Sequence, residues 1–165
     1  MIENLEQLFN SDIRYMYDAE RQLANIMPKV VEKTNSQELR ELIYKHIDDN
    51  RNHVSRIESV SEYIDLNIDG EGKTSKGMEG LHEELNDLIV KSDGFEDSVF
   101  DAALISALQR IQHYEIASYG TLRTYANILD KKSAAEVFQQ ILNEEKKTDS
   151  SLTEIAVRTV NREAQ

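Results

Sequence analysis

Acidic and imidazole side chains recur in this sequence at helix positions where a buried face would carry apolar residues. Six of them are candidate metal ligands: Glu20, Asp49, His53, Glu115, Glu145 and Asp149. Carboxylates combined with imidazole suit iron or manganese, and helical bundles hold pairs of such ions between facing helices. These residue types therefore indicate an internal site for two ions of iron or manganese per chain.

The spacing of these residues repeats in the two halves of the chain. Glu20 and Asp49 are 29 residues apart, and Glu115 and Glu145 are 30 apart. In each half, a further potential ligand follows the second carboxylate by four residues, a separation that keeps both side chains on one helix face. We therefore predict that two helical hairpins contribute one carboxylate from the first helix and two ligands from the second.

Burial of these carboxylates needs a compensating partner. An unpaired buried charge costs several kcal/mol, whereas a domain is stable by only about 5–15 kcal/mol. A cation, protonation or a base such as Arg56, paired with Asp149 or Glu145, could balance the charge. We interpret His46 as a core residue and Tyr119 as a packing residue rather than as functional groups.

The helices that position these residues follow from apolar stripes with a helical period. Long helices are predicted over 2–33, 37–66, 99–129 and 134–161, with a shorter one over 78–91. Ser36 and Ser133 are expected to be N-caps, and 67–77 forms the long connection. The prediction is one all-α domain over 1–165, a ferritin-like four-helix bundle with a short fifth helix in the crossover between the hairpins.

Composition excludes several classes of function. The formal net charge of −12 disfavours nucleic-acid binding, and no apolar run approaches the roughly 18 residues of a membrane span. The absence of cysteine excludes thiolate chemistry. Since the N-terminal residues lack a secretory signal pattern, we expect a cytoplasmic protein without membrane or nucleic-acid partners.

Several segments resemble one family along nearly the whole chain: "DAERQL", "GMEGL", "QHYEIASYGTL" and "EEKKTDSSLTEIA". They are similar to the YciF-like bacterial stress proteins, a branch of the ferritin-like superfamily. The resemblance implies a dimeric five-helix bundle with an internal dinuclear metal site, and its acidic positions match Glu20, Glu115, Glu145 and Asp149. This chain has Asp-Asp-Asn at 48–50, where family members usually have Glu-Glu-Thr.

The leading hypothesis is a cytoplasmic, homodimeric stress protein whose two metal ions act on a small oxidant, peroxide or oxygen. The alternative is a metal-free helical scaffold or dimerisation module whose polar layer only fixes helix register. An iron-storage shell is a third, disfavoured hypothesis, because no further helix follows 134–161.

Overall fold

The computed structural model describes residues 2–69 and 74–165, and these residues form helices and no strands. The long helices are α1 (Leu5–Lys33), α2 (Gln37–Tyr63), α4 (Asp97–Ile128) and α5 (Lys132–Ile155), with the shorter α3 (Lys76–Val90) between α2 and α4. A 3₁₀ turn at Ser92–Gly94 precedes α4, and after α5 the chain continues through a π-helical turn, Ala156–Val160, into α6 (Asn161–Glu163).

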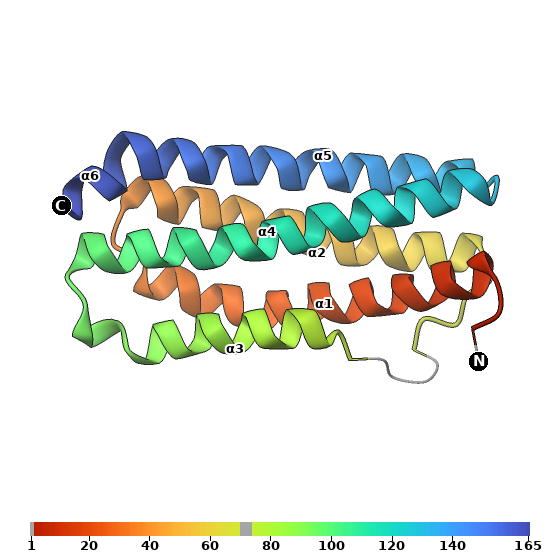
Figure 1. The fold of residues 1–165 in the computed structure, drawn as a ribbon, viewed down its shortest axis with the longest axis horizontal. Helices are drawn as coiled ribbons and strands as arrows, with labels where there is room; N and C mark the ends of the chain where they lie inside the picture. Colours follow the sequence, from red (N-terminus) through yellow and green to blue (C-terminus); the bar gives the residue numbers. More distant parts are fainter. Residues whose placement is uncertain (1, 70–73) are drawn as a thin grey trace.

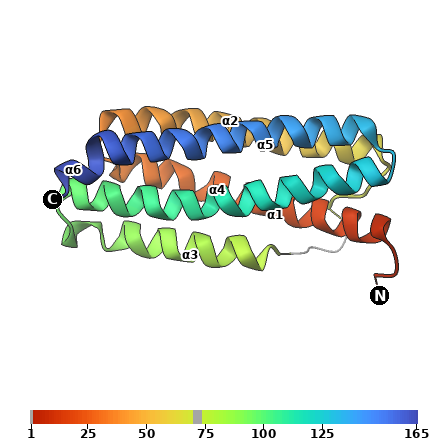
Figure 2. The same cartoon turned by 45° about the horizontal axis from the view of Figure 1, so that its top comes forward.

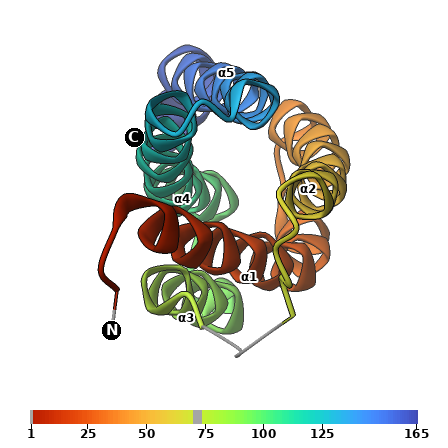
Figure 3. The same ribbon diagram turned by 90° about the vertical axis from the view of Figure 1, so that its right-hand side faces the viewer.

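The four long helices surround a common core, and the predicted all-α bundle is confirmed (Figure 1, Figure 3). Within the bundle, α1 packs on α2 and α4, and α5 packs on α2 and α4. The short α3 lies outside, along α1 and α4, on the side of the molecule away from α5 (Figure 2). Part of the predicted 67–77 connection, residues 70–73, lies outside the described residues.

The helix boundaries follow from capping. The predicted cap at Ser36 is confirmed, since its hydroxyl accepts a hydrogen bond from the Leu39 N–H. The predicted cap at Ser133 is wrong, because α5 already begins at Lys132. Asp130 adopts a left-handed conformation with φ of 55°, and the Lys131 N–H bonds the Ala126 carbonyl, so the end of α4 sets the start of α5.

The core is apolar at both ends of the bundle and polar in the middle. On α1 the buried residues pass from Phe9 and Met16 through Glu20 to Leu23 and Val30. The same change occurs on α2, α4 and α5, where buried polar residues interrupt the apolar stripes. The fold therefore assembles one polar layer across four helices.

Asp101 fixes the turn between α1 and α2 to the start of α4. Its buried carboxylate accepts hydrogen bonds from the backbone N–H groups of Asn35 at 3.0 Å and Ser36 at 2.5 Å. These bonds connect segments more than 60 residues apart and set the axial position of α4 relative to the α1–α2 hairpin.

Replacing this carboxylate should destabilise the fold. Asp101→Ala leaves two backbone N–H groups without their acceptor, and we expect it to lower the free energy of unfolding by about 2–4 kcal/mol. Asp101→Asn keeps one acceptor oxygen and should lose less. Urea unfolding followed by circular dichroism measures both, and an Ala variant as stable as the wild type would contradict this role.

Candidate metal centre

The polar layer consists of side chains from all four long helices. Its buried members, each no more than 3% exposed, are Glu20, His46, Asn50, His53, Gln112, Glu115 and Glu145. They come from α1, α2, α4 and α5, and Tyr119 on α4 packs against them. None of the acidic members reaches solvent, so their environment is close to that of a dry core.

One group of three residues within the layer could hold a metal ion. His46, Glu115 and Glu145 each offer a ligand atom, and these atoms lie within 4.8 Å of one another. The Nε2 atom of His46 is 3.7 Å from Glu145 Oε2. The Gln112 amide donates to Glu115 Oε2 at 3.3 Å and lies 3.2 Å from His46 Nε2, so it holds two of the three groups in place.

The other half of the layer is occupied by contacts between protein groups. The Tyr119 hydroxyl donates to Glu20 Oε1, and the Asn50 amide donates to Glu20 Oε2 at 2.5 Å and to its backbone carbonyl at 3.0 Å. The His53 Nδ1 atom is 3.1 Å from Glu145 Oε1 and 3.5 Å from Glu20 Oε1. His53 therefore lies between the two halves.

His53 also connects the layer to the surface. Its Nε2 atom bonds the Glu144 carboxylate at 2.8 Å, and that carboxylate accepts a second bond from Arg56 Nη1, also at 2.8 Å. Glu144 is one third exposed. Arg56 thus pairs with Glu144, and not with Asp149 or Glu145 as the sequence suggested.

Several polar atoms in the layer have no hydrogen-bond partner among the described residues. They are Asn50 Oδ1, His53 Nδ1, Gln112 Oε1, Glu115 Oε1 and both carboxylate oxygens of Glu145. His53 Nδ1 is close to Glu145, but the ring is not oriented for a hydrogen bond. Buried polar atoms are nearly always satisfied in folded proteins. Unpartnered carboxylate oxygens beside an imidazole fit a divalent transition-metal ion, so the residues present suit the group that the fold implies.

The structure brings together four of the six predicted ligands: Glu20, His53, Glu115 and Glu145. Asp49 is outside the layer and forms an ion pair with Lys45. The reason is helical phase. Because His46, Asn50 and His53 face inward at intervals of four and three residues, the neighbouring Asp49 points about 100° away.

Asp149, on α5, is likewise outside the layer. Its carboxylate accepts a bond from Gln109 at 3.2 Å and lies 3.5 Å from His113, which is mostly exposed. One turn earlier, Glu145 points inward, and Thr148 continues its buried face. Glu145 and Asp149, four residues apart on α5, therefore do not point at one centre.

Three residues of the layer, His46, Asn50 and Gln112, were not among the predicted ligands. The signal for Asn50 was present, since 30 residues separate Glu20 from Asn50 as they separate Glu115 from Glu145. Di-metal bundles use a Glu-x-x-His motif on two helices. Here α2 carries Asn50-x-x-His53, and α5 carries Glu145-x-x-Thr148, so each helix keeps one half of the motif.

Burial and mutual repulsion shift the protonation of the layer. Burial, together with the nearby carboxylates of Glu145 and Glu20, raises the pKa of Glu115 well above 4.5. Burial lowers the pKa of His53, but the same two carboxylates outweigh this effect and raise it to about 10. The pKa of Tyr119 is raised by burial and by Glu20, so its hydroxyl keeps the proton that it donates. Without metal, protons on Glu115 and His53 therefore offset part of the buried charge.

Glu115→Gln tests this assignment. An amide resembles the neutral carboxylic acid in shape, so the metal-free variant should have a melting temperature equal to or above that of the wild type at pH 7, while binding metal poorly. Calorimetry of the chelator-treated proteins measures this. If Glu115 balanced a buried base instead, the variant would lose about 3–5 kcal/mol of stability.

The pH dependence of stability follows from the same shifts. The folded chain retains protons on Glu115 above pH 4.5 and on His53 above pH 6.5, where the unfolded chain has released them. Stability from His53 is therefore complete below about pH 6.5 and is lost as the pH approaches 10. We expect the melting temperature of the metal-free protein to fall between about pH 5 and 9. The melting temperature should fall less with pH in Glu115→Gln. An equal or steeper fall in that variant would contradict the raised pKa of Glu115.

Comparison with known proteins agrees with this fold. The family described as "domain of unknown function (DUF892)" matches residues 4–165. The chain is 36% identical to protein YciF of Escherichia coli K12 over 164 residues, which covers 99% of this chain and 97% of YciF. The crystal structure of the E. coli stress protein YciF superimposes with a TM-score of 0.90, at 37% identity over 97% of this chain and 99% of that one. YcfI from Rhodopseudomonas palustris superimposes with a TM-score of 0.83, at 27% identity over 92% and 94% of the two chains. The chain therefore belongs to the DUF892 family, which the sequence resemblance to YciF-like proteins had indicated, and its fold is ferritin-like.

Proposed function

We propose that this protein binds a divalent transition-metal ion, iron or manganese, inside the bundle at His46, Glu115 and Glu145. The observation that carries the proposal is the convergence of these three ligand atoms within 4.8 Å, with one oxygen of Glu115 and both of Glu145 unpartnered. Binding would displace the proton from Glu115, so the ion takes over the charge balance that protonation supplies in its absence.

One ion per chain is favoured over the two that the sequence suggested. The position on α2 equivalent to Glu145 is Asn50, which donates to Glu20 instead of offering a carboxylate. Both oxygens of Glu20 already accept hydrogen bonds, from Asn50 and Tyr119. A second ion would have to displace these bonds, so we propose that the half containing Glu20 and His53 orients the first ion's ligands.

A bound iron or manganese ion would supply redox chemistry toward a small oxidant, peroxide or oxygen. The chain's own groups would then exclude bulk water and hold protons at defined atoms, the Tyr119 hydroxyl against Glu20 and the His53 ring between Glu145 and Glu144. The E. coli relative is a stress protein, and a stress-associated role for this chain is part of the proposal. None of the helices in the described part of the chain has the length and apolarity that crossing a membrane requires.

A metal-free scaffold is the second candidate, and one observation favours it. Protonated His53 and neutral Glu115 offset part of the buried charge without any ion. In a scaffold the polar layer would fix helix register, and adding metal or chelator would leave the melting temperature unchanged.

Metal analysis separates the two candidates. After reconstitution with Mn²⁺ or Fe²⁺, followed by desalting, we expect close to one ion per chain and a higher melting temperature than in the chelator-treated protein. Glu145→Gln should lose most of the metal, because it removes the central carboxylate. Glu136→Gln, an exposed change on the same helix, is the matched control and should bind as the wild type does. Well under one ion per chain in the wild type would refute the metal-binding proposal.

A further inference from the structure

The candidate centre is closed to solvent, so an ion must pass through a wall of the bundle to reach it. Glu115, Glu145 and His46 are each no more than 3% exposed. The following inference rests on the proposed metal binding and concerns the route that the ion takes.

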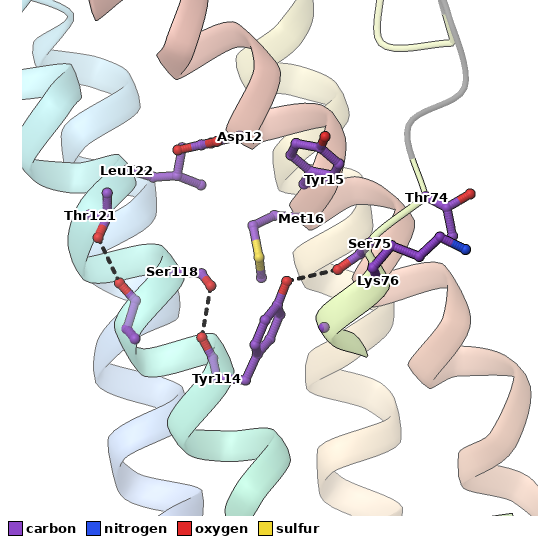
Figure 4. A pocket seen from close by; sticks show the side chains of 12 residues that line it. Asp12, Tyr15, Met16, Thr74, Ser75, Lys76, Tyr114, Ser118, Thr121 and Leu122 are labelled. Atoms are coloured by element: carbon purple, nitrogen blue, oxygen red, sulfur yellow. Dashed lines mark hydrogen bonds between the residues drawn. The ribbon is translucent and has the colours of Figure 1, made fainter. Parts of the chain in front are cut away.

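A cavity of about 540 Å³ lies where α1, α4 and the beginning of α3 meet (Figure 4). Its wall carries oxygen atoms from Asp12, Tyr15, Ser118 and Thr121, and Met16 forms part of its inner side. In Figure 4 the Met16 side chain extends from α1 across the space toward α4.

This cavity and the polar layer are consecutive along one face of α1. Asp12, Met16 and Glu20 are four residues apart, so their positions advance about 6 Å per step along the helix axis. Asp12 is half-buried at the cavity, Met16 is 2% exposed, and Glu20 is fully buried. On α4 the cavity residue Leu122 is one turn from Tyr119, which bonds Glu20. On α1, Met16 therefore lies between the cavity residue Asp12 and Glu20 of the polar layer. On α4, the cavity residue Ser118 is one turn from Glu115 of the centre.

Charge distinguishes this cavity from other hollows on the surface. The hollow between α1 and α2 is lined by Arg21 and Arg51, and two hollows beside α4 each include Arg110. On the α2–α5 side, Glu144 connects His53 to the surface, and Arg56 is bonded to Glu144. Arg51 pairs with Asp48, Arg110 with Glu84 and Arg56 with Glu144, so these guanidinium groups reduce the net negative charge around their hollows.

Among the described residues that line the cavity against α1 and α4 there is no arginine. The cation among them, Lys76, forms an ion pair with Glu79 at 2.5 Å. The Asp12 carboxylate and the hydroxyl oxygens are chemically suited to a hydrated divalent cation, and the net charge of −12 draws such cations toward the protein.

We propose that this cavity is the entrance through which a divalent metal ion reaches the buried centre, with Met16 as the side chain that moves aside. Methionine suits this role because its unbranched thioether chain changes conformation readily within a packed core. The entrance governs how fast the ion binds, and it leaves the equilibrium affinity, set by His46, Glu115 and Glu145, unchanged.

Stopped-flow mixing of the metal-free protein with Co²⁺ tests the route, since the visible absorption of Co²⁺ changes when protein ligands replace water. Ala117→Trp fills the cavity from its exposed wall on α4 and should slow binding at least about tenfold. Met16→Ala opens the inner side and should speed binding several-fold. The matched control is Ala24→Trp, which fills the arginine-lined hollow between α1 and α2 and should leave the rate unchanged. Circular dichroism and the Co²⁺ content at equilibrium, both expected to match the wild type, show that each variant is folded and keeps its site.

The possible outcomes separate this inference from the proposed function. If the wild type binds Co²⁺ and Ala117→Trp binds it at the same rate, the entrance is elsewhere and the inference is overturned while metal binding stands. If Ala24→Trp slows binding as much as Ala117→Trp does, the route is also refuted. If the wild type binds no Co²⁺ at equilibrium, the proposed function fails and the route fails with it.

Discussion

The cost of placing three glutamates in a dry helical core is the constraint on which the rest of this structure depends. Glu20, Glu115 and Glu145 are at most 1% exposed, and each would destabilise the fold by several kcal/mol if left charged and unpaired. The cost of burial is reduced in a different way for each glutamate. Glu20 accepts hydrogen bonds on both oxygens, Glu115 is protonated more readily than an exposed carboxyl group, and Glu145 faces two imidazoles.

The residues around the layer are best understood as supports for this balance. The side-chain amide of Gln112 contacts both Glu115 and His46. Glu144, itself bonded to Arg56, bonds the Nε2 atom of His53. Asp101 acts at a distance by fixing α4 against the α1–α2 turn. A shift of one residue along any helix would turn a layer member by about 100° and disrupt the balance, so helix register and charge balance are set together.

The sequence alone predicted the fold and four of the residues that form the polar layer. Apolar stripes and sparse glycine and proline located all five main helices, and the misplaced charges identified Glu20, Glu115, Glu145 and His53 as inward-facing. Asp49 and Asp149 were predicted from their four-residue spacing to His53 and Glu145. That spacing places two residues on one face, but it does not fix which of two neighbouring positions faces the core, because the rotation of the helix depends on its packing. His46 was read as an ordinary core histidine, since its contact with Glu145 and Gln112 depends on how α2, α4 and α5 are packed.

The two halves of the chain share a 30-residue spacing but differ in chemistry, and this difference explains the asymmetry of the centre. In the first half, Asn50 stands where the second half has Glu145, so Glu20 is satisfied by an amide donor within the protein. In the second half, Thr148 stands where the first half has His53, and His46 reaches across from α2 to supply the missing imidazole. In the first half, both carboxylate oxygens of Glu20 thereby accept hydrogen bonds within the protein. The second half retains unpartnered oxygens on Glu115 and Glu145. Since buried oxygens without partners are costly, the second half is where a cation would stabilise the protein most.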